Sequence, residues 1–286
     1  MNPLTNIDII KHIMKRHGIA FNKKFGQNFL TDEAVVDSIS EMSGVSKNDA
    51  VLEIGPGIGT LTYSLLSFAN KVVSVEIDSG LIPVLSETLS EFDNFELINS
   101  DILKLDLNEL IQDKFAGEPP FVIANLPYYI TSPILMYLLE SKIPFKRIVV
   151  MVQKEVADRL SSKPGTKDYG VITAAVSYYA DVKTLFEVKR DCFIPSPNVD
   201  SAVIELIPRK HPTCKPKSED MFFKTIKASF AQRRKTLLNS ISKSGYITLP
   251  KEEIERAISD CGISPSVRGE TLSIDDFAKL SDKFGG

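Results

Sequence analysis

The stretch "VLEIGPGIGTLT" at residues 51–62 joins a short apolar run to a helical pattern through a turn that contains three glycines. Glycine lets the main chain approach a ligand closely, and the helix that follows offers N–H groups at its first turn. The dinucleotide fingerprint G-x-G-x-x-G does not fit, because Thr60 occupies the sixth position. The spacing E-x-G-x-G-x-G from Glu53 to Gly59 predicts a ligand-binding strand, turn and helix, with a plain tight turn as the alternative.

Short apolar runs alternate with amphipathic segments around this turn. They lie at 50–54, 71–77, 95–99, 120–125 and 147–153. Near-continuous apolar strands that alternate with helices are typical of a parallel sheet covered on both faces. Two further strands, near 182–189 and 200–207, are separated by the turn-rich "FIPSPN" and predict an antiparallel pair at the sheet edge. The fold class is therefore α/β, with a seven-stranded, mostly parallel sheet.

A change of pattern late in the chain predicts a second, smaller domain. After a segment rich in proline and lysine, only helical patterns follow, at 222–242, 250–262 and 272–284. Ser273 precedes Asp276 by three residues, as in a capping box. We expect a catalytic domain at 1–209, with a basic N-terminal segment at 1–24, and a helical domain at 210–286.

The composition is that of an ordinary globular protein, with 43% hydrophobic and 25% charged residues among 286. No apolar run approaches the roughly 20 residues that span a bilayer, and the N-terminus lacks a signal h-region, so we expect no membrane association and a cytoplasmic location. Cys192, Cys214 and Cys261 have neither metal-ligand nor disulfide spacing. We expect reduced structural thiols and no metal site.

Basic residues gather near both ends of the chain, although the net charge is −3. Ten lysines and arginines lie between 207 and 243, opposed only by Glu219 and Asp220. Such segregation is usually a solvated face, but two basic segments around an acidic middle suggest nucleic-acid binding. The side chains expected to contact phosphates are Lys224, Lys227, Arg233, Arg234 and Lys235. For the last three, the polar face of a helix is the alternative.

Polar side chains stand at the ends of three successive expected strands. Glu76 can accept hydrogen bonds from both hydroxyls of a ribose, and Asp101 can accept one from an adenine amine. Asn125 follows the next strand. The carboxyl ends of strands line the ligand crevice of an open α/β sheet. Together with the glycine turn, these positions predict a site for a nucleoside-containing ligand.

The sequence Asn125-Leu126-Pro127-Tyr128 suits chemistry on an exocyclic adenine amine. That amine is a poor nucleophile, because its lone pair is conjugated into the ring. Two acceptors on its hydrogens, the Asn125 side-chain oxygen and the Leu126 or Pro127 carbonyl, favour a pyramidal nitrogen that can attack a methyl group in line. Tyr128 is expected to stack on the base, which contributes roughly 1–3 kcal/mol.

The glycine motif resembles the first motif of S-adenosylmethionine-dependent methyltransferases, and the whole chain resembles the KsgA-type small-subunit (16S) rRNA adenine N6,N6-dimethyltransferases. Seven blocks occur in that family's order: "KKFGQNFL" (23–30), "EIGPGIGTLT" (53–62), "NLPYYITSPIL" (125–135), "MVQKEVADRL" (151–160), "FIPSPNVDSAV" (193–203), "SFAQRRKTLLNS" (229–240) and "RGETLS" (268–273). The resemblance implies a Rossmann-like fold and dimethylation of two adjacent adenosines near the 3′ end of small-subunit rRNA in a pre-ribosomal particle. We expect a monomer that uses S-adenosylmethionine and releases S-adenosylhomocysteine.

The resemblance also assigns roles to individual residues. Its cofactor contacts fall on Gln27, Asn28, Leu30, Gly55, Glu76, Asp101 and Asn125, and the glycine turn adds Gly57. Phe193 matches an aromatic residue proposed to sandwich the target base opposite Tyr128. Without the resemblance, Phe193 would be assigned to the core, because its neighbours are apolar.

Alternatives remain for the target and for several side chains. Large-subunit rRNA methyltransferases of the macrolide-resistance type tend to have G-S-G-K-G-H-F-T and N-I-P-Y, and DNA adenine methyltransferases D-P-P-Y, so both fit less well. A ribosome-assembly factor, in which particle binding matters more than methylation, is the alternative from another class. Lys23 and Lys24 suit RNA contact and solvation equally, and we expect Tyr129, Tyr178 and Tyr179 to pack.

Overall fold

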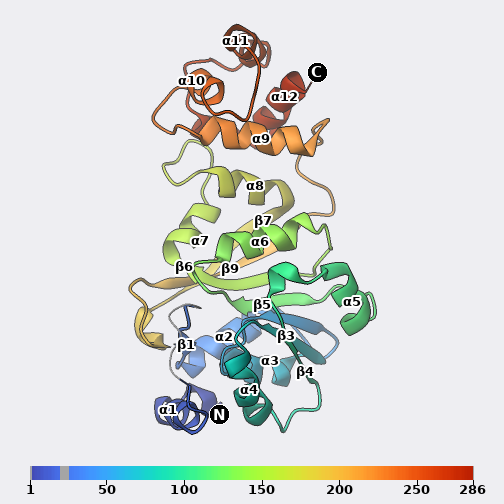
Figure 1. Cartoon of the computed structure of the whole chain (residues 1–286), viewed down its shortest axis with the longest axis vertical. Helices are drawn as coiled ribbons and strands as arrows, with labels where there is room; N and C mark the ends of the chain where they lie inside the picture. The colour runs from blue at the N-terminus through green and yellow to red at the C-terminus, as the bar shows by residue number, and fades with distance from the viewer. Residues whose placement is uncertain (1, 20–25, 286) are drawn as a thin grey trace. The chain divides into compact units, whose positions relative to one another are not determined.

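The computed structural model describes residues 2–19 and 26–285, and Figure 1 labels its main elements. The strands are β1 (Phe29–Leu30), β2 (Ala50–Ile54), β3 (Lys71–Glu76), β4 (Phe95–Asn99), β5 (Phe121–Asn125), β6 (Ile148–Gln153), β7 (Ala180–Val188), β8 (Phe193–Ile194) and β9 (Ser201–Pro208). The α-helices are α1 (Ile7–Arg16), α2 (Glu33–Ser43), α3 (Thr60–Phe68), α4 (Ile82–Thr88), α5 (Leu107–Phe115), α6 (Thr131–Glu140), α7 (Lys154–Leu160), α8 (Val171–Tyr179), α9 (Glu219–Phe230), α10 (Leu237–Ser242), α11 (Lys251–Asp260) and α12 (Ile274–Phe284).

The main sheet has seven strands in the order β4-β3-β2-β5-β6-β9-β7. The pairs from β4 to β6 are parallel, whereas β9 runs antiparallel to β6. This confirms the expected α/β class with a seven-stranded, mostly parallel sheet. Two of the apolar runs, 50–54 and 95–99, coincide with β2 and β4. The run in β2 is almost fully buried, which explains why it does not alternate with polar residues.

The strand order reverses beside β2. The chain leaves β2 through α3 toward β3 and β4 on one side, and it returns to pair β5 with the other side of β2. In open α/β sheets such a reversal opens a crevice at the carboxyl ends of the strands. The fold therefore brings the ends of β2, β3, β4 and β5 to one edge.

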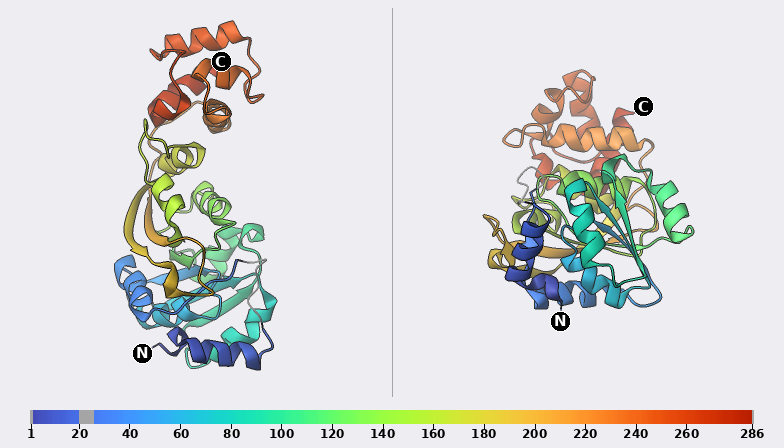
Figure 2. Two further views of the ribbon diagram at one scale, coloured as in Figure 1. Left: turned by 90° about the vertical axis from the view of Figure 1, so that its left-hand side faces the viewer. Right: turned by 60° about the horizontal axis from the view of Figure 1, so that its bottom comes forward.

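The N-terminal part of the chain contacts α4 and β8. Helix α1 lies beside α4, because Arg16 and His17 at the end of α1 both contact the Glu87 carboxylate (Figure 1 and Figure 2). The short strand β1 pairs antiparallel with β8, with Leu30 opposite Phe193. Residues 26–30 thus lie close to the segment that precedes β9.

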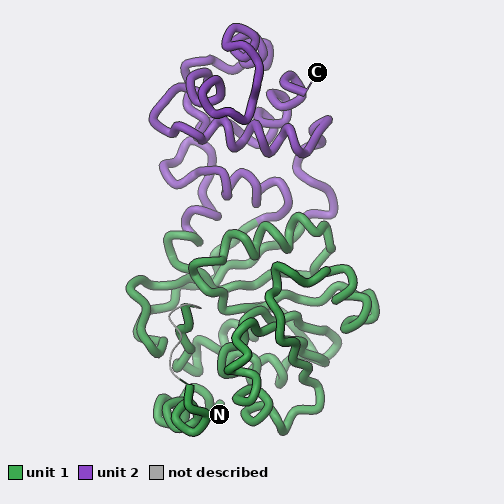
Figure 3. Tube along the Cα trace, in the orientation of Figure 1, with its two compact units in different colours: residues 1–157, 182–208 green, residues 158–181, 209–286 purple. Residues whose placement is uncertain are grey.

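The chain divides into two compact units, coloured separately in Figure 3: residues 1–157 with 182–208, and residues 158–181 with 209–286. The second unit contains α8 as well as the C-terminal helices. Tyr178 of α8 packs on Phe222, with ring centroids 4.8 Å apart, and its hydroxyl donates to Glu219 Oε1 at 3.1 Å. Tyr178 and Tyr179 are buried, so their expected packing role is confirmed.

The helical pattern at 222–242 divides into α9 and α10, joined by a turn at 231–236. Ser240 Oγ accepts a hydrogen bond from the Gln232 N–H at 3.0 Å and donates to the Ala228 carbonyl at 2.8 Å, which holds this turn closed. The basic residues at 233–235 therefore lie on a turn, and the helix-face alternative for them is wrong. The expected capping box is present, because Ser273 and Asp276 each accept from the other's backbone N–H.

The described helices and the cysteines bear on membrane association and on disulfides. Over residues 2–19 and 26–285, no helix is long and apolar enough to cross a bilayer. The cysteines at 192, 214 and 261 are free and half-buried, consistent with reduced structural thiols.

Candidate active site

A cavity opens at the edge where the parallel strands end. Its space is about 1000 Å³, part of it open solvent, which suits a ligand of nucleoside size. Every residue expected to contact the cofactor lines it: Gln27, Asn28, Leu30, Gly55, Gly57, Glu76, Asp101 and Asn125. Leu126, Pro127 and Tyr128 line it too. The structure thus brings together five segments that are separated in the sequence.

The glycine turn forms one wall of the cavity. Gly55, Gly57 and Gly59 all have positive φ, the left-handed region in which residues with a Cβ are strained. At Gly57 a Cβ would lie only 3.1 Å from the Phe29 ring. Helix α3 begins directly after Gly59. Its first N–H groups therefore face the cavity edge, where a partial positive charge favours electron-rich ligand atoms.

Glu76 is the buried carboxylate at the end of β3. Its oxygens accept from the N–H groups of Gly57 at 3.2 Å and Asp78 at 2.8 Å. Burial raises the pKa of Glu76 to about 6, although these hydrogen bonds favour the charged form. Asp101, at the end of β4, accepts from the Leu103 N–H through Oδ1. Two carboxylates thus stand on neighbouring strand ends.

The oxygen atoms after β5 differ in whether they already accept hydrogen bonds within the protein. Asn125 donates through Nδ2 to the Asn28 carbonyl at 3.2 Å, which leaves Oδ1 as the atom that can accept from a ligand amine. The Pro127 carbonyl already accepts from the Ile130 N–H at 3.2 Å and from Thr131 Oγ1 at 3.1 Å. Of the two carbonyls considered from the sequence, the geometry favours Leu126.

The two tyrosines after Pro127 point to different sides. The Tyr128 hydroxyl lies 2.6 Å from Oγ of Ser201, the first residue of β9. Tyr129 is 57% exposed and lines the cavity, so the expectation that it packs is wrong. Residues 128–130 form a turn, and the Tyr129 side chain is exposed there.

Phe193 lies in the hydrophobic core. It is 4% exposed and is absent from the described lining of the cavity. It stands opposite Leu30 in the ladder of β1 and β8, and Leu30 does line the cavity. The expected stacking of Phe193 on a target base stays a prediction.

Sequence reasoning missed two carboxylates near the cavity. Glu53 is 1% exposed and accepts from Thr62 Oγ1 at 2.7 Å and from Ser74 Oγ at 2.6 Å. Burial raises its pKa to about 7. Asp78 accepts from Gln27 Nε2 at 2.7 Å. An acidic residue inside the apolar strand 50–54 was the signal available for Glu53.

The expected phosphate contacts differ in how they are held. Lys224 pairs with Asp220 at 2.7 Å, and Lys227 is exposed on α9. Arg234 and Lys235 are exposed on the turn that follows α9. Lys23 and Lys24 lie outside the described residues. Over the described residues, no cluster of three possible metal ligands occurs.

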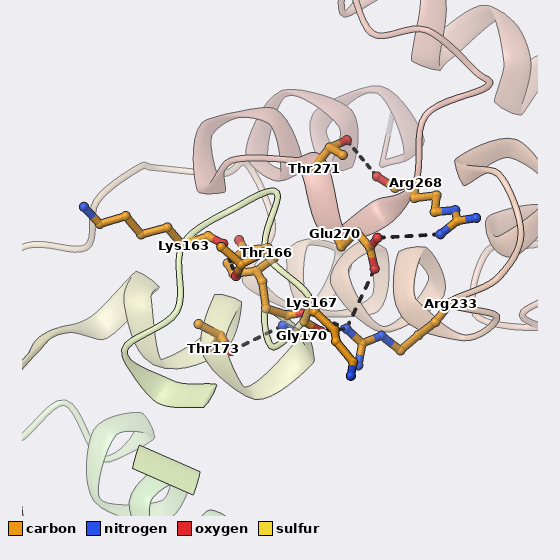
Figure 4. A network of polar contacts seen from close by, with 10 residues as sticks. Lys163, Thr166, Lys167, Gly170, Thr173, Arg233, Arg268, Glu270 and Thr271 are labelled. Carbon is orange, nitrogen blue, oxygen red and sulfur yellow. Dashed lines mark hydrogen bonds and ion pairs between the residues drawn. The ribbon is translucent and has the colours of Figure 1, made fainter. Parts of the chain in front are cut away.

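Arg233 has structural partners inside the second unit, as Figure 4 shows. Its Nη2 donates to the carbonyls of Lys167 at 2.6 Å and Tyr169 at 3.0 Å, and it lies 3.8 Å from the Glu270 carboxylate. The Gly165 N–H donates to the Glu270 carbonyl at 2.7 Å. Arg233 thus fastens the loop at 161–170 to the C-terminal helices, a role that its position beside Arg234 did not suggest.

Comparisons with known proteins agree on one family. The model described as "Ribosomal RNA adenine dimethylase" matches residues 18–284. The "Ribosomal RNA small subunit methyltransferase A" of Lachnoclostridium phytofermentans is 52% identical over 271 residues, 94% of this chain and 93% of the relative. The protein of that name from Clostridioides difficile is 49% identical over 282 residues, 99% of this chain and 97% of the relative.

Solved structures agree with the sequence relatives. A dimethyladenosine transferase from Plasmodium falciparum is similar with a TM-score of 0.74 and 27% identity, covering 88% of this chain and 95% of that one. A 23S rRNA methyltransferase has a TM-score of 0.65 and 26% identity, covering 90% and 100%. Both similarities extend over most of each chain, which supports the methyltransferase fold.

Proposed function

The chain belongs to the ribosomal RNA adenine dimethylase family, and from this premise we propose that it dimethylates N6 of two adjacent adenosines near the 3′ end of small-subunit rRNA. The observation that carries the proposal is the cavity in which Glu76, Asp101 and Asn125 meet the glycine turn. The small-subunit target is supported by the names of the relatives at 49–52% identity.

The residues around the cavity fit S-adenosylmethionine. Glu76 offers acceptor oxygens for ribose hydroxyls, and its pKa of about 6 leaves it mostly ionised at neutral pH. Asp101 offers an acceptor for the adenine amine, and the N–H groups at the start of α3 suit electron-rich atoms. When bound, the cofactor supplies an electrophilic methyl group on a sulfonium.

Asn125 and Leu126 act on the target amine. Asn125 Oδ1 and the Leu126 carbonyl accept the two N6 hydrogens, which localises the nitrogen lone pair. The nitrogen lone pair would then bond to the methyl group that the cofactor supplies, with the electron pair of the C–S bond leaving on sulfur, and the acidic ammonium product would release a proton to solvent. Holding the amine and the methyl group in line contributes on the order of 7–11 kcal/mol to lowering the barrier. Tyr128 stacks on the flipped base.

The contacts that hold the rRNA backbone lie outside the cavity. Residues 1–157 with 182–208 form the catalytic unit, and residues 158–181 with 209–286, in which α8 packs against α9, orient the RNA; relative to the expected boundary at 209/210, residues 158–181 belong to the second unit. Lys224, Lys227, Arg234 and Lys235 contact phosphates and carry no sequence information. A particle substrate and a monomeric enzyme suit this division, and a ribosomal substrate implies a cytoplasmic location.

Transfer of tritiated methyl groups to small-subunit particles, large-subunit particles and naked rRNA tests the function. We expect label in the small-subunit particle and two dimethylated adenosines. The Asn125→Ala variant should lose at least about 10²-fold in rate, because a positioned acceptor is lost at the reacting atom. Asn108→Ala, an exposed asparagine on α5, serves as the matched control. Label in the large subunit alone, or full activity of Asn125→Ala, would contradict the proposal.

A further inference from the structure

Tyr129 differs from the other aromatic side chains near the cavity in being mostly exposed. Its ring is 57% accessible, yet it borders the same space as Glu76, Asp101 and Asn125. Burying an exposed tyrosine ring removes a large apolar area from water. A ligand that fills the cavity would therefore remove more apolar area of this ring from water than of a ring that is already buried.

The Tyr129 ring lies beside Gly26. A Cβ placed on Gly26 would lie 3.5 Å from Tyr129 Cδ1 and 3.9 Å from Cε1, so the ring borders the space next to this glycine. Gly26 also borders the cavity, one residue before Gln27. Gly26 and the Tyr129 ring are therefore neighbours in the lining of the cavity.

The Tyr129 ring shares the lining of the cavity with the carboxylates of Glu76 and Asp101. Burial and the negative charges of Asp101 and Glu76 raise the pKa of the Tyr129 hydroxyl, in keeping with that placement. Tyr128 points elsewhere, toward Ser201 on β9. Two consecutive tyrosines therefore serve two parts of one cavity.

We propose that Tyr129 covers the nucleoside half of the bound cofactor and contacts its adenosine, while Tyr128 contacts the target base. This inference rests on the proposed function, because it requires the carboxylates at the ends of β3 and β4 to bind that nucleoside. The Tyr129 ring, which lies beside Gly26, then covers a ligand that those carboxylates hold. Tyr129 is a cofactor-binding residue in this arrangement and has no role in moving the proton.

Calorimetric titration with S-adenosylhomocysteine and 5′-methylthioadenosine tests the contact. The second probe keeps the nucleoside and lacks the amino-acid part. In Tyr129→Ala both dissociation constants should rise roughly 5- to 150-fold, the equivalent of about 1–3 kcal/mol of base–aromatic stacking. Tyr129→Phe keeps the ring and should bind both probes more tightly than Tyr129→Ala. The affinity for small-subunit particles, measured without cofactor, should be the same in the alanine variant and the parent.

A spectroscopic measurement keeps the test independent of small affinity changes. The chain contains no tryptophan, so Tyr129→Trp introduces a single reporter at the cavity. Its emission should change when 5′-methylthioadenosine binds. In the matched control Tyr246→Trp, a tyrosine that is 46% exposed in the second unit, emission should stay constant.

The outcomes separate this inference from the proposed function. If the parent chain binds neither probe, the cofactor assignment itself fails. If the parent binds both probes and Tyr129→Ala binds them equally well, only the inference about Tyr129 is wrong. Loss of particle affinity with unchanged probe affinity would likewise overturn it, because Tyr129 would then contact the RNA.

Discussion

The buried carboxyl of Glu53 should make the stability of the protein fall as the pH rises. Burial raises the pKa of this group from 4.5 to about 7 in the folded state. Between these two values the folded state holds a proton that the unfolded state has released. Raising the pH therefore favours the unfolded chain until the folded-state pKa is passed, and the loss is complete above it.

The size of the effect follows from the shift. A difference of about 2.5 pKa units corresponds to roughly 3 kcal/mol in total, of which roughly 2.5 kcal/mol falls between pH 5 and pH 8. Glu53→Gln keeps an oxygen that can accept from Thr62 and Ser74 and removes the titration. Between pH 5 and pH 8, the unfolding free energy of this variant should fall by roughly 2.5 kcal/mol less than that of the parent.

Urea denaturation at pH 5, 6, 7 and 8, followed by circular dichroism, measures this difference. Glu96→Gln is the control, because Lys114 and Lys71 lower the pKa of Glu96, outweighing partial burial. Its unfolding free energy should therefore keep the pH dependence of the parent above pH 5. If Glu53→Gln and the parent lose equal free energy between pH 5 and pH 8, the raised pKa of Glu53 is wrong.

Three further predictions concern the turn, the second unit and its last helix. Gly57→Ala should lower stability by about 1–2 kcal/mol and weaken S-adenosylhomocysteine binding, because its φ is positive and Phe29 is close; chemical denaturation and calorimetry measure both. Arg233→Ala should destabilise the protein by about 1–3 kcal/mol, whereas the stability of Arg234→Ala should stay within about 0.5 kcal/mol of the parent; chemical denaturation measures both. Arg234→Ala should also reduce the salt dependence of RNA binding, which binding measurements at several salt concentrations would show. Ser273→Ala should cost about 1 kcal/mol through loss of the α12 cap, measured by thermal unfolding.

Much of the fold and of the cavity could be predicted because the relevant signals are local. An apolar run, a glycine turn and a polar residue at a strand end are each read within a few residues, and parallel pairing then brings the strand ends to one edge. The direction of the Tyr129 ring was beyond that reasoning, because it depends on the turn after Pro127 and on Gly26, about a hundred residues earlier. The partners of Arg233 were also hidden, since Lys167 and Tyr169 lie more than sixty residues away in the sequence.

The two-residue ladder of β1 and β8 has a thermodynamic consequence. Leu30 borders the cavity, and its partner Phe193 is buried in the core. If Phe193 leaves the core to reach a base, a ladder of this length has to shift, and the shift reaches the cavity through Leu30. Cofactor binding and RNA binding then change each other's affinity by one common factor, because linkage between two sites is reciprocal.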